Sequence, residues 1–148
     1  MSGKRMVWAK KLPEVYKKLD EVDKVIGEHL DVTVLELVKL RSSVLNSCSY
    51  CVDLHTKMAL KAGETQQRLF QVSSWYESGD LFTPAERAAL ALTDEVTRLG
   101  DRGVSDEVYD AAAEYFDEQQ MAALVSAISM MNLYNRLAVT SQIRPRTK

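Results

Sequence analysis

Apolar residues recur at the three- and four-residue steps of an α-helix along nearly the whole chain, and this periodicity limits the possible folds most strongly. Val15, Leu19, Val22 and Ile26 follow Pro13, a residue suited to the first turn of a helix. The 148 residues include only six glycines and three prolines, too few for an all-β protein rich in tight turns. The pattern therefore predicts an all-α fold.

Capping residues divide the chain into six or seven helices. Thr83-Pro84-Ala85-Glu86, for example, combines a cap, a first-turn proline and the glutamate of a capping box. The segment 31–46 also has strand propensity at its start, but its apolar stripe favours a helix. We expect helices over residues 13–27, 31–46, 48–62, 65–76, 83–99, 105–115 and 118–139, with a loop over residues 77–82.

Composition and charge limit the organisation and the possible partners. No linker or repeat occurs, so we expect a single domain over residues 1–148 with a frayed basic tail at 143–148. The 19 basic and 21 acidic residues nearly balance, so there is no general attraction to nucleic acid or anionic membranes. The longest uncharged stretch, 119–135, is shorter than the roughly 20 residues of a membrane span. With no signal-peptide pattern at the start, we expect a cytoplasmic protein.

Three polar residues stand where the helical pattern calls for apolar ones. Arg41 interrupts the stripe of the segment 31–46. It could pair with a carboxylate near the site or at a subunit contact, but because long arginine side chains reach water from such positions, we favour a place at the surface. Asn132 and Asn135 interrupt the last helix. Buried amides need partners, which predicts hydrogen bonds from these two side chains to other helices or subunits.

Both cysteines of the chain lie in one C-x-x-C motif, Cys48-Ser-Tyr-Cys51, at the predicted start of a helix. Backbone N–H groups and the positive end of the helix dipole favour a thiolate there. His55 follows Cys51 by one turn on the same face, where a neutral imidazole can take the thiol proton. Glu36, on the preceding helix, can orient that imidazole if the two helices pack antiparallel.

Three interpretations of the motif compete. A redox-active dithiol uses one reactive thiol and a second thiol that resolves its oxidised form. A structural zinc site needs four ligands, so a carboxylate such as Glu36 or Asp53 would have to join the two cysteines and His55. The third interpretation is a pair of buried, inert thiols. Because both cysteines share one motif with a histidine on the same face, we favour the redox dithiol, with no metal and no cofactor.

The spacing of these residues resembles that of a known family. Glu36, eleven further residues, Cys48-x-x-Cys51, three further residues and His55 are similar to the AhpD-like alkylhydroperoxidase core of the carboxymuconolactone decarboxylase superfamily. The segments LRSSVLNSCSYCVDLHTKMALKAGETQQRL and NLYNRLAV resemble the central hairpin and the last helix of that family, so the resemblance spans about residues 13–139. It implies an AhpD-like helical bundle whose subunits assemble as dimers, trimers or hexamers.

The resemblance also implies roles for four residues. In AhpD-like proteins the second cysteine of the motif attacks the peroxide, so Cys51 corresponds to the peroxidatic thiol and Cys48 to the resolving thiol. Glu36 and His55 would form the proton relay. One position departs from the pattern, since AhpD proteins carry a histidine just before the second cysteine and this chain has Tyr50, a poor base near neutral pH.

We therefore expect a thiol-dependent peroxidase that reduces organic hydroperoxides or hydrogen peroxide through a Cys51 sulfenic acid and a Cys48–Cys51 disulfide. A dithiol or a protein reductant would be its partner. Two other activities stay open: a disulfide-exchange adaptor or redox sensor, and a carboxymuconolactone decarboxylase. The dithiol argues against the decarboxylase, because the decarboxylating branches of the superfamily work without a redox C-x-x-C.

Overall fold

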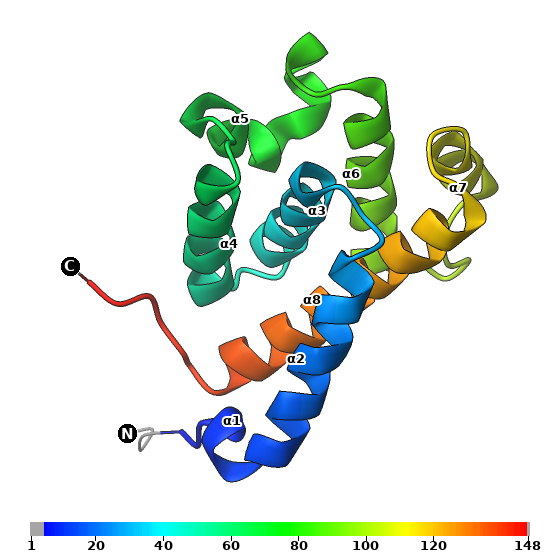
Figure 1. Cartoon of the computed structure of the whole chain (residues 1–148). Coiled ribbons are helices and arrows are strands. Elements are labelled where there is room, and N and C mark those ends of the chain that lie inside the picture. Colours follow the sequence, from blue (N-terminus) through cyan, green and yellow to red (C-terminus); the bar gives the residue numbers. More distant parts are fainter. Residues whose placement is uncertain (1–4, 148) are drawn as a thin grey trace.

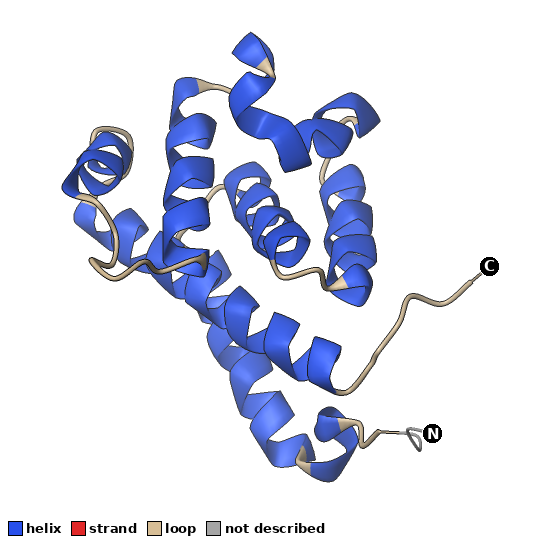
Figure 2. Cartoon of the chain, turned by 180° about the vertical axis from the view of Figure 1, so that it is seen from behind, coloured by secondary structure: helices blue, strands red, loops and turns tan. Residues whose placement is uncertain are grey.

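The computed structural model describes residues 5–147, in which the regular elements are helices, and one helix lies at the centre between several others (Figures 1 and 2). The elements are α1 (Trp8–Lys11), α2 (Pro13–Gly27), α3 (Val32–Leu45), α4 (Ser49–Lys61), α5 (Gln66–Gln71), the 3-10 turns η1 (Val72–Glu77) and η2 (Gly79–Leu81), α6 (Pro84–Thr97), α7 (Asp106–Ala113) and α8 (Glu118–Thr140). Over the described residues there is no β-strand, so the predicted all-α fold is confirmed. None of these helices combines the length and apolar character that crossing a membrane requires.

The observed elements differ from the prediction in three places. Helix α1 is not expected from the sequence, and its Trp8 ring packs 6.4 Å from that of Tyr134, far along the chain. The predicted helix 65–76 is divided into α5 and η1, and Ser74 leaves helical geometry within η1 (φ −127°). The predicted loop 77–82 contains the short turn η2. The described chain therefore has eight α-helices rather than six or seven.

Helix α3 is the central helix and packs against α4, α6 and α8 (Figure 1). Nine of its 14 residues are buried. Leu37 and Leu40 join an apolar cluster with α4, α5, η1 and α6, whereas Val34 and Val38 join a second cluster with α6, α7 and α8. A helix buried on all sides has no single polar face. This is why the sequence of the segment shows only a weak helical stripe.

Three charged side chains of α3 are buried, and each pairs with a different neighbouring helix. The pairs are Glu36 with His55 of α4, Lys39 with Asp23 of α2, and Arg41 with Asp94 of α6. Burying an unpaired charge is unfavourable, and removing one partner of a buried pair costs about 3–5 kcal/mol. These contacts therefore position α3 against three neighbours at once.

The prediction that Arg41 reaches the surface is wrong. Its side chain is only 8% exposed, and it donates to both carboxylate oxygens of Asp94, at 2.6 and 3.0 Å. The third nitrogen of the guanidinium donates to the carbonyls of Val72 and Ser73. Trp75 adds a hydrogen bond to the same aspartate. Because a planar guanidinium offers five N–H donors, one arginine can satisfy acceptors on both η1 and α6.

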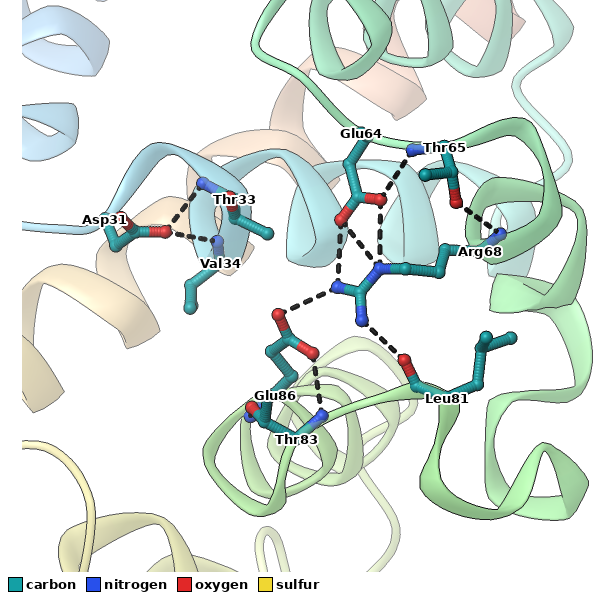
Figure 3. Close-up of polar contacts among 9 residues, drawn as sticks. All are labelled: Asp31, Thr33, Val34, Glu64, Thr65, Arg68, Leu81, Thr83 and Glu86. Atoms are coloured by element: carbon teal, nitrogen blue, oxygen red, sulfur yellow. Dashed lines mark hydrogen bonds and ion pairs between the residues drawn. The ribbon is translucent and has the colours of Figure 1, made fainter.

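A second, partly buried network ties the segment after α4 to α5 and α6 (Figure 3). Arg68 donates to Glu64 at 2.9 Å and to Glu86 at 2.8 Å. It also donates to the carbonyl of Leu81. Glu86 also accepts from the backbone of Thr83, which completes the predicted capping box. The hydrogen bonds that Arg68 donates to Glu64, and in smaller part the one to Glu86, raise the pKa of Arg68 above its usual range. The network keeps the irregular segment between α5 and α6 in place.

Helix α8 runs beside α2 and α3 and ends in a Schellman-type turn (Figure 1). Gln142 takes a φ of 54°, and the N–H of Ile143 donates to the carbonyl of Ala138 at 3.0 Å. Ile143 is therefore packed rather than frayed, because the turn directs it back against α8. Residues 144–147 have no regular secondary structure, while residue 148 of the predicted tail and residues 1–4 of the predicted domain lie outside the described range.

Candidate functional site

The C-x-x-C motif starts in the short connection between α3 and α4. Helix α3 ends in a Schellman motif, in which the N–H of Cys48 donates to the carbonyl of Ser43 at 2.9 Å. The N–H of Ser47 donates to the carbonyl of Val44 at 3.1 Å, and Ser47 takes the left-handed conformation that the motif requires (φ 53°). The chain thus reverses at Ser47, and Cys48 is the first residue after the turn.

Cys48 is also the N-cap of α4. Its sulfur accepts a hydrogen bond from the N–H of Cys51 at 3.3 Å, and the two cysteines form a disulfide. One residue therefore closes α3 through its backbone and caps α4 through its side chain. Both sulfur atoms belong to the N-terminal end of α4, where the helix dipole favours negative charge on sulfur. The predicted position of the motif at a helix N-terminus is confirmed.

Glu36 and His55 meet inside the hairpin formed by α3 and α4. His55 Nδ1 lies 2.9 Å from Glu36 Oε2, and the two residues are 6% and 3% exposed. An ionised carboxylate can only accept, so His55 then donates through Nδ1 and keeps a free lone pair on Nε2. Cys51 and His55 both belong to the buried face of α4, one turn apart. The hairpin therefore links all four residues that the sequence singles out, Cys48 being joined through its disulfide.

Helix α8 and the residue that follows its final turn cover the disulfide. Cys48 and Cys51 are 2% and 3% exposed. The side chains packed around them are Met131, Tyr134, Ala138 and Ile143. All of these except Ile143 come from α8, and Ile143 comes from the segment that follows it. A reagent therefore cannot reach either sulfur atom in this arrangement without a local movement.

The two tyrosines near the motif are unsuited to act as a base. Burial, with a smaller contribution from acidic residues of α2, raises the pKa of Tyr134 to about 12. Its hydroxyl therefore stays protonated at neutral pH and can only donate or accept a hydrogen bond. Tyr50, which replaces the histidine of AhpD proteins, is 37% exposed on the outer side of α4. His55, rather than either tyrosine, is therefore the side chain near the motif that is suited to receive a thiol proton.

The candidate zinc ligands are engaged in other contacts. Cys48 and Cys51 share the disulfide, and Glu36 pairs with His55. Asp53, the other carboxylate considered as a fourth ligand, pairs with Lys57 at 2.6 Å. Over residues 5–147, no three histidine, cysteine or acidic side chains are grouped so as to hold a metal ion. This arrangement does not offer the four free donors of a structural zinc site.

A shallow hollow opens on the surface beside the motif. Its volume is about 550 Å³, and its lining residues are Val44, Ser47, Ser49, Val52, Asp53 and Thr56. Ser47 and Ser49 flank Cys48 in the chain, but the disulfide itself is not part of the lining. The hollow thus reaches the backbone around Cys48 and stops short of the sulfur atoms.

Sequence reasoning found some of the residues around the disulfide and missed others. The predicted interhelical bonds of Asn132 and Asn135 are confirmed, since both amides contact Asn46 of the α3–α4 connection, at 2.9 and 3.0 Å. The contacts of Ala138 and Ile143 with the cysteines were not predicted. Only the packing of α8 across the hairpin brings these distant positions together, and no local pattern in the sequence signals it.

Comparisons with known proteins agree with this geometry. Residues 13–95 match the model of the carboxymuconolactone decarboxylase family. The chain belongs to this family. Among its relatives, the uncharacterized protein YdfG of Bacillus subtilis is 36% identical over 137 residues, 92% of each chain.

Solved structures show which core within the family this chain shares. A protein of unknown function from Agrobacterium tumefaciens, proposed to be the antioxidant defence protein AhpD, is 29% identical, with a TM-score of 0.92 and coverage of 99% of this chain and 100% of that one. The debrominase Bmp8 shares the fold at 20% identity, with a TM-score of 0.81 and coverage of 93% and 74%. The chain thus has the AhpD-like core, and with its C-x-x-C disulfide it fits a redox role.

The cover over the disulfide generates a prediction. In Ile143→Ala, we expect tris(2-carboxyethyl)phosphine to reduce the Cys48–Cys51 disulfide severalfold faster than in the unchanged protein, because a side chain packed against the sulfur cluster is removed. The measurement is the time course of thiol release. Val139→Ala is the matched control, since Val139 is 45% exposed and outside the cluster. Equal rates in Ile143→Ala and the unchanged protein would show that access does not pass Ile143.

Proposed function

We propose that this family member is a thiol-dependent peroxidase that reduces organic hydroperoxides or hydrogen peroxide. One observation carries the proposal: the Cys48–Cys51 disulfide starts α4, and the buried His55–Glu36 pair lies one turn further along the same face. A peroxidatic cycle needs a reducible cysteine pair and a positioned base. Peroxide is the substrate and a dithiol or protein thiol is the reductant, so these residues need neither a metal nor a cofactor.

The first step forms a sulfenic acid on Cys51. In the reduced protein, Nε2 of His55 takes the thiol proton, and the N-terminal end of α4 stabilises the resulting thiolate. The thiolate attacks the terminal peroxide oxygen, so that an S–O bond forms and the O–O bond breaks. The alkoxide takes the proton back from His55 and leaves as an alcohol, or as water when the substrate is hydrogen peroxide. Glu36 holds Nδ1–H and stabilises the imidazolium between the two proton transfers.

The second step forms the disulfide and the third regenerates the thiols. The Cys48 sulfur attacks the Cys51 sulfur, an S–S bond replaces the S–O bond, and the hydroxyl leaves as water with the Cys48 proton. A dithiol donor then reduces the disulfide through two thiol exchanges and is itself oxidised to a disulfide. Electrons therefore pass from the donor to the peroxide, and Cys48 and Cys51 return to their starting state.

The cysteine roles are tested by intact mass after one equivalent of an organic hydroperoxide is added to the reduced protein. We expect the unchanged protein to lose two hydrogen atoms, Cys48→Ser to gain one oxygen atom, and Cys51→Ser to stay unchanged. These results would assign attack to Cys51 and resolution to Cys48, because only the attacking thiol takes up oxygen.

Three outcomes would contradict this proposal. If Cys51→Ser consumes peroxide at the rate of the unchanged protein, Cys51 is not the attacking thiol. If none of the three proteins is oxidised rapidly, the same disulfide serves exchange with a partner protein, as in a redox adaptor or sensor. Conversion of carboxymuconolactone by the reduced protein would instead identify a decarboxylase.

The proton relay is tested by Glu36→Gln. We expect the rate of sulfenic acid formation to fall about 100-fold, because a neutral amide no longer stabilises the imidazolium that transfers the proton. Stopped-flow measurement of Cys51 oxidation in the Cys48→Ser background gives this rate. Glu86→Gln is the matched control, a buried glutamate paired with Arg68 in a different network. If both variants react at the same rate, Glu36 plays no part in the proton transfer.

Assembly into a homo-oligomer, as a dimer, trimer or hexamer, belongs to the same proposal, as do a single domain and a cytoplasmic location that keeps thiol reductants within reach. The support for assembly is helix α2, which has no buried residue over its 15 positions. Its apolar residues Val15, Val22 and Val25 are 41%, 47% and 55% exposed. Exposed apolar side chains gathered on one helix are typical of a subunit contact.

A charge placed on this face tests the assembly. We expect Val22→Glu to lower the mass of the particle measured by light scattering, because a carboxylate would be buried without a partner at the contact. Lys17→Glu is the control on the same helix, because the Lys17 side chain is exposed and lies on a different side of α2 from Val15 and Val22. A monomeric unchanged protein, or a Val22→Glu variant of unchanged mass, would refute an α2-mediated contact.

A further inference from the structure

The connection that presents Cys48 is held by helix α8 through side-chain amides. Asn46, the last residue before the turn, donates to Asn132 Oδ1 at 2.9 Å and to Asn135 Oδ1 at 3.0 Å. Asn135 donates in turn to Ser43 Oγ at 3.1 Å. Asn135 is completely buried, so its amide depends on these protein partners for hydrogen bonds.

Arg136 fixes which group of each amide donates and which accepts. Arg136 can only donate, and it lies 2.8 Å from Asn132 Oδ1, so that oxygen is an acceptor. Asn46 must then present its NH₂ group to Asn132, and the same group faces Asn135. The opposite orientation of the Asn135 amide would place its NH₂ group 3.2 and 3.3 Å from the carbonyls of Met131 and Ser42, but it would also set two NH₂ groups 3.0 Å apart. Asn135 therefore accepts from Asn46 through Oδ1 and donates to Ser43 Oγ through Nδ2.

Asn135 thus contacts both ends of the turn that sets the position of Cys48. Ser43 supplies the carbonyl that accepts from the Cys48 N–H, and Asn46 is the C-cap residue directly after α3. The same face of α8 also carries Met131 and Ala138, which pack on the cysteines. One helix therefore covers the sulfur atoms and holds the turn from which one of them projects.

The hold of α8 on the turn has its largest effect when the disulfide is reduced to two thiols. The S–S bond then no longer holds Cys48 near Cys51, and the turn depends on its hydrogen bonds alone. The equilibrium between dithiol and disulfide reflects how often the two sulfur atoms meet, which is an effective concentration set by the rigidity of the connection. Contacts that hold the turn therefore favour the disulfide.

We propose that Asn135, acting through Asn46 and Ser43, is a positioning residue that keeps Cys48 within bonding reach of Cys51. The proposal rests on the redox role of the cysteine pair proposed above. Asn135 itself takes no part in electron or proton transfer. Its contribution is to raise the rate at which the Cys51 sulfenic acid is resolved and to stabilise the resulting disulfide.

The test is the dithiol–disulfide equilibrium of the whole protein in a glutathione redox buffer. We expect Asn46→Ala and Asn135→Leu each to shift the equilibrium constant about tenfold toward the dithiol, which corresponds to about 30 mV. Asn46 is half-buried at the end of a helix, so its substitution leaves the core intact even if Asn135→Leu folds poorly. Because the two variants remove one shared contact, the double variant should shift the equilibrium by much less than the product of the single shifts.

The control is Thr93→Val. Thr93 is fully buried, and its hydroxyl donates within its own helix to the carbonyl of Ala89, so this variant loses a buried polar group without touching the turn. We expect its equilibrium constant to be unchanged. Equal shifts in Thr93→Val and Asn46→Ala, or independent shifts of Asn46→Ala and Asn135→Leu, would mean that general destabilisation explains the effect and would overturn the proposal.

A second measurement separates this proposal from the peroxidase proposal. In the Cys48→Ser background, Asn46→Ala should form the Cys51 sulfenic acid at an unchanged rate, because the positioned residue is Cys48. In the presence of Cys48, resolution to the disulfide should be about tenfold slower. If peroxide proves not to be a substrate, the glutathione equilibrium still decides the positioning role, since no peroxide takes part in it. An unchanged equilibrium in both asparagine variants would refute the positioning role alone.

Discussion

The burial of α3 on all sides is the constraint on which the rest of the structure depends. A helix in this position cannot leave a charged side chain in water, so Glu36, Lys39 and Arg41 each require a partner on a neighbouring helix. Their closest contacts, 2.9, 2.7 and 2.6 Å, lead to α4, α2 and α6. Apolar packing alone is non-directional, whereas these paired charges specify the register of each neighbour against α3.

One of these pairs, Glu36 with His55, is also part of the candidate site. The contact between Glu36 and His55 joins the two arms of the hairpin, and Cys51 lies one turn before His55 on the same buried face. The same hydrogen bond therefore contributes to the packing of the fold and to the orientation of the imidazole. At the closed end of the hairpin, Cys48 ends one helix through its N–H and caps the next through its sulfur. The geometry of the cysteine pair is thus a property of two helix termini.

Helix α8 completes the surroundings of the motif with two kinds of contact. Its apolar side chains exclude water from the disulfide, and its amides hold the connection between α3 and α4. The apolar contacts depend on the amide contacts, because an apolar cover protects the sulfur atoms only if the turn beneath it stays in place. The low exposure of both cysteines makes local movement of this cover part of any reaction with a small reagent or a partner protein.

Local sequence signals determined most of the helices of this protein and the residues of its candidate site. Caps such as Thr83 and the residues that form the C-x-x-C and its histidine act through contacts within a few residues, so they can be read without the fold. The helix α1, the burial of Arg41 and the cover over the cysteines depend on segments far apart in the chain. Only the tertiary structure decided them, because side-chain burial and long-range pairing are set by how helices pack rather than by the periodicity of any one helix.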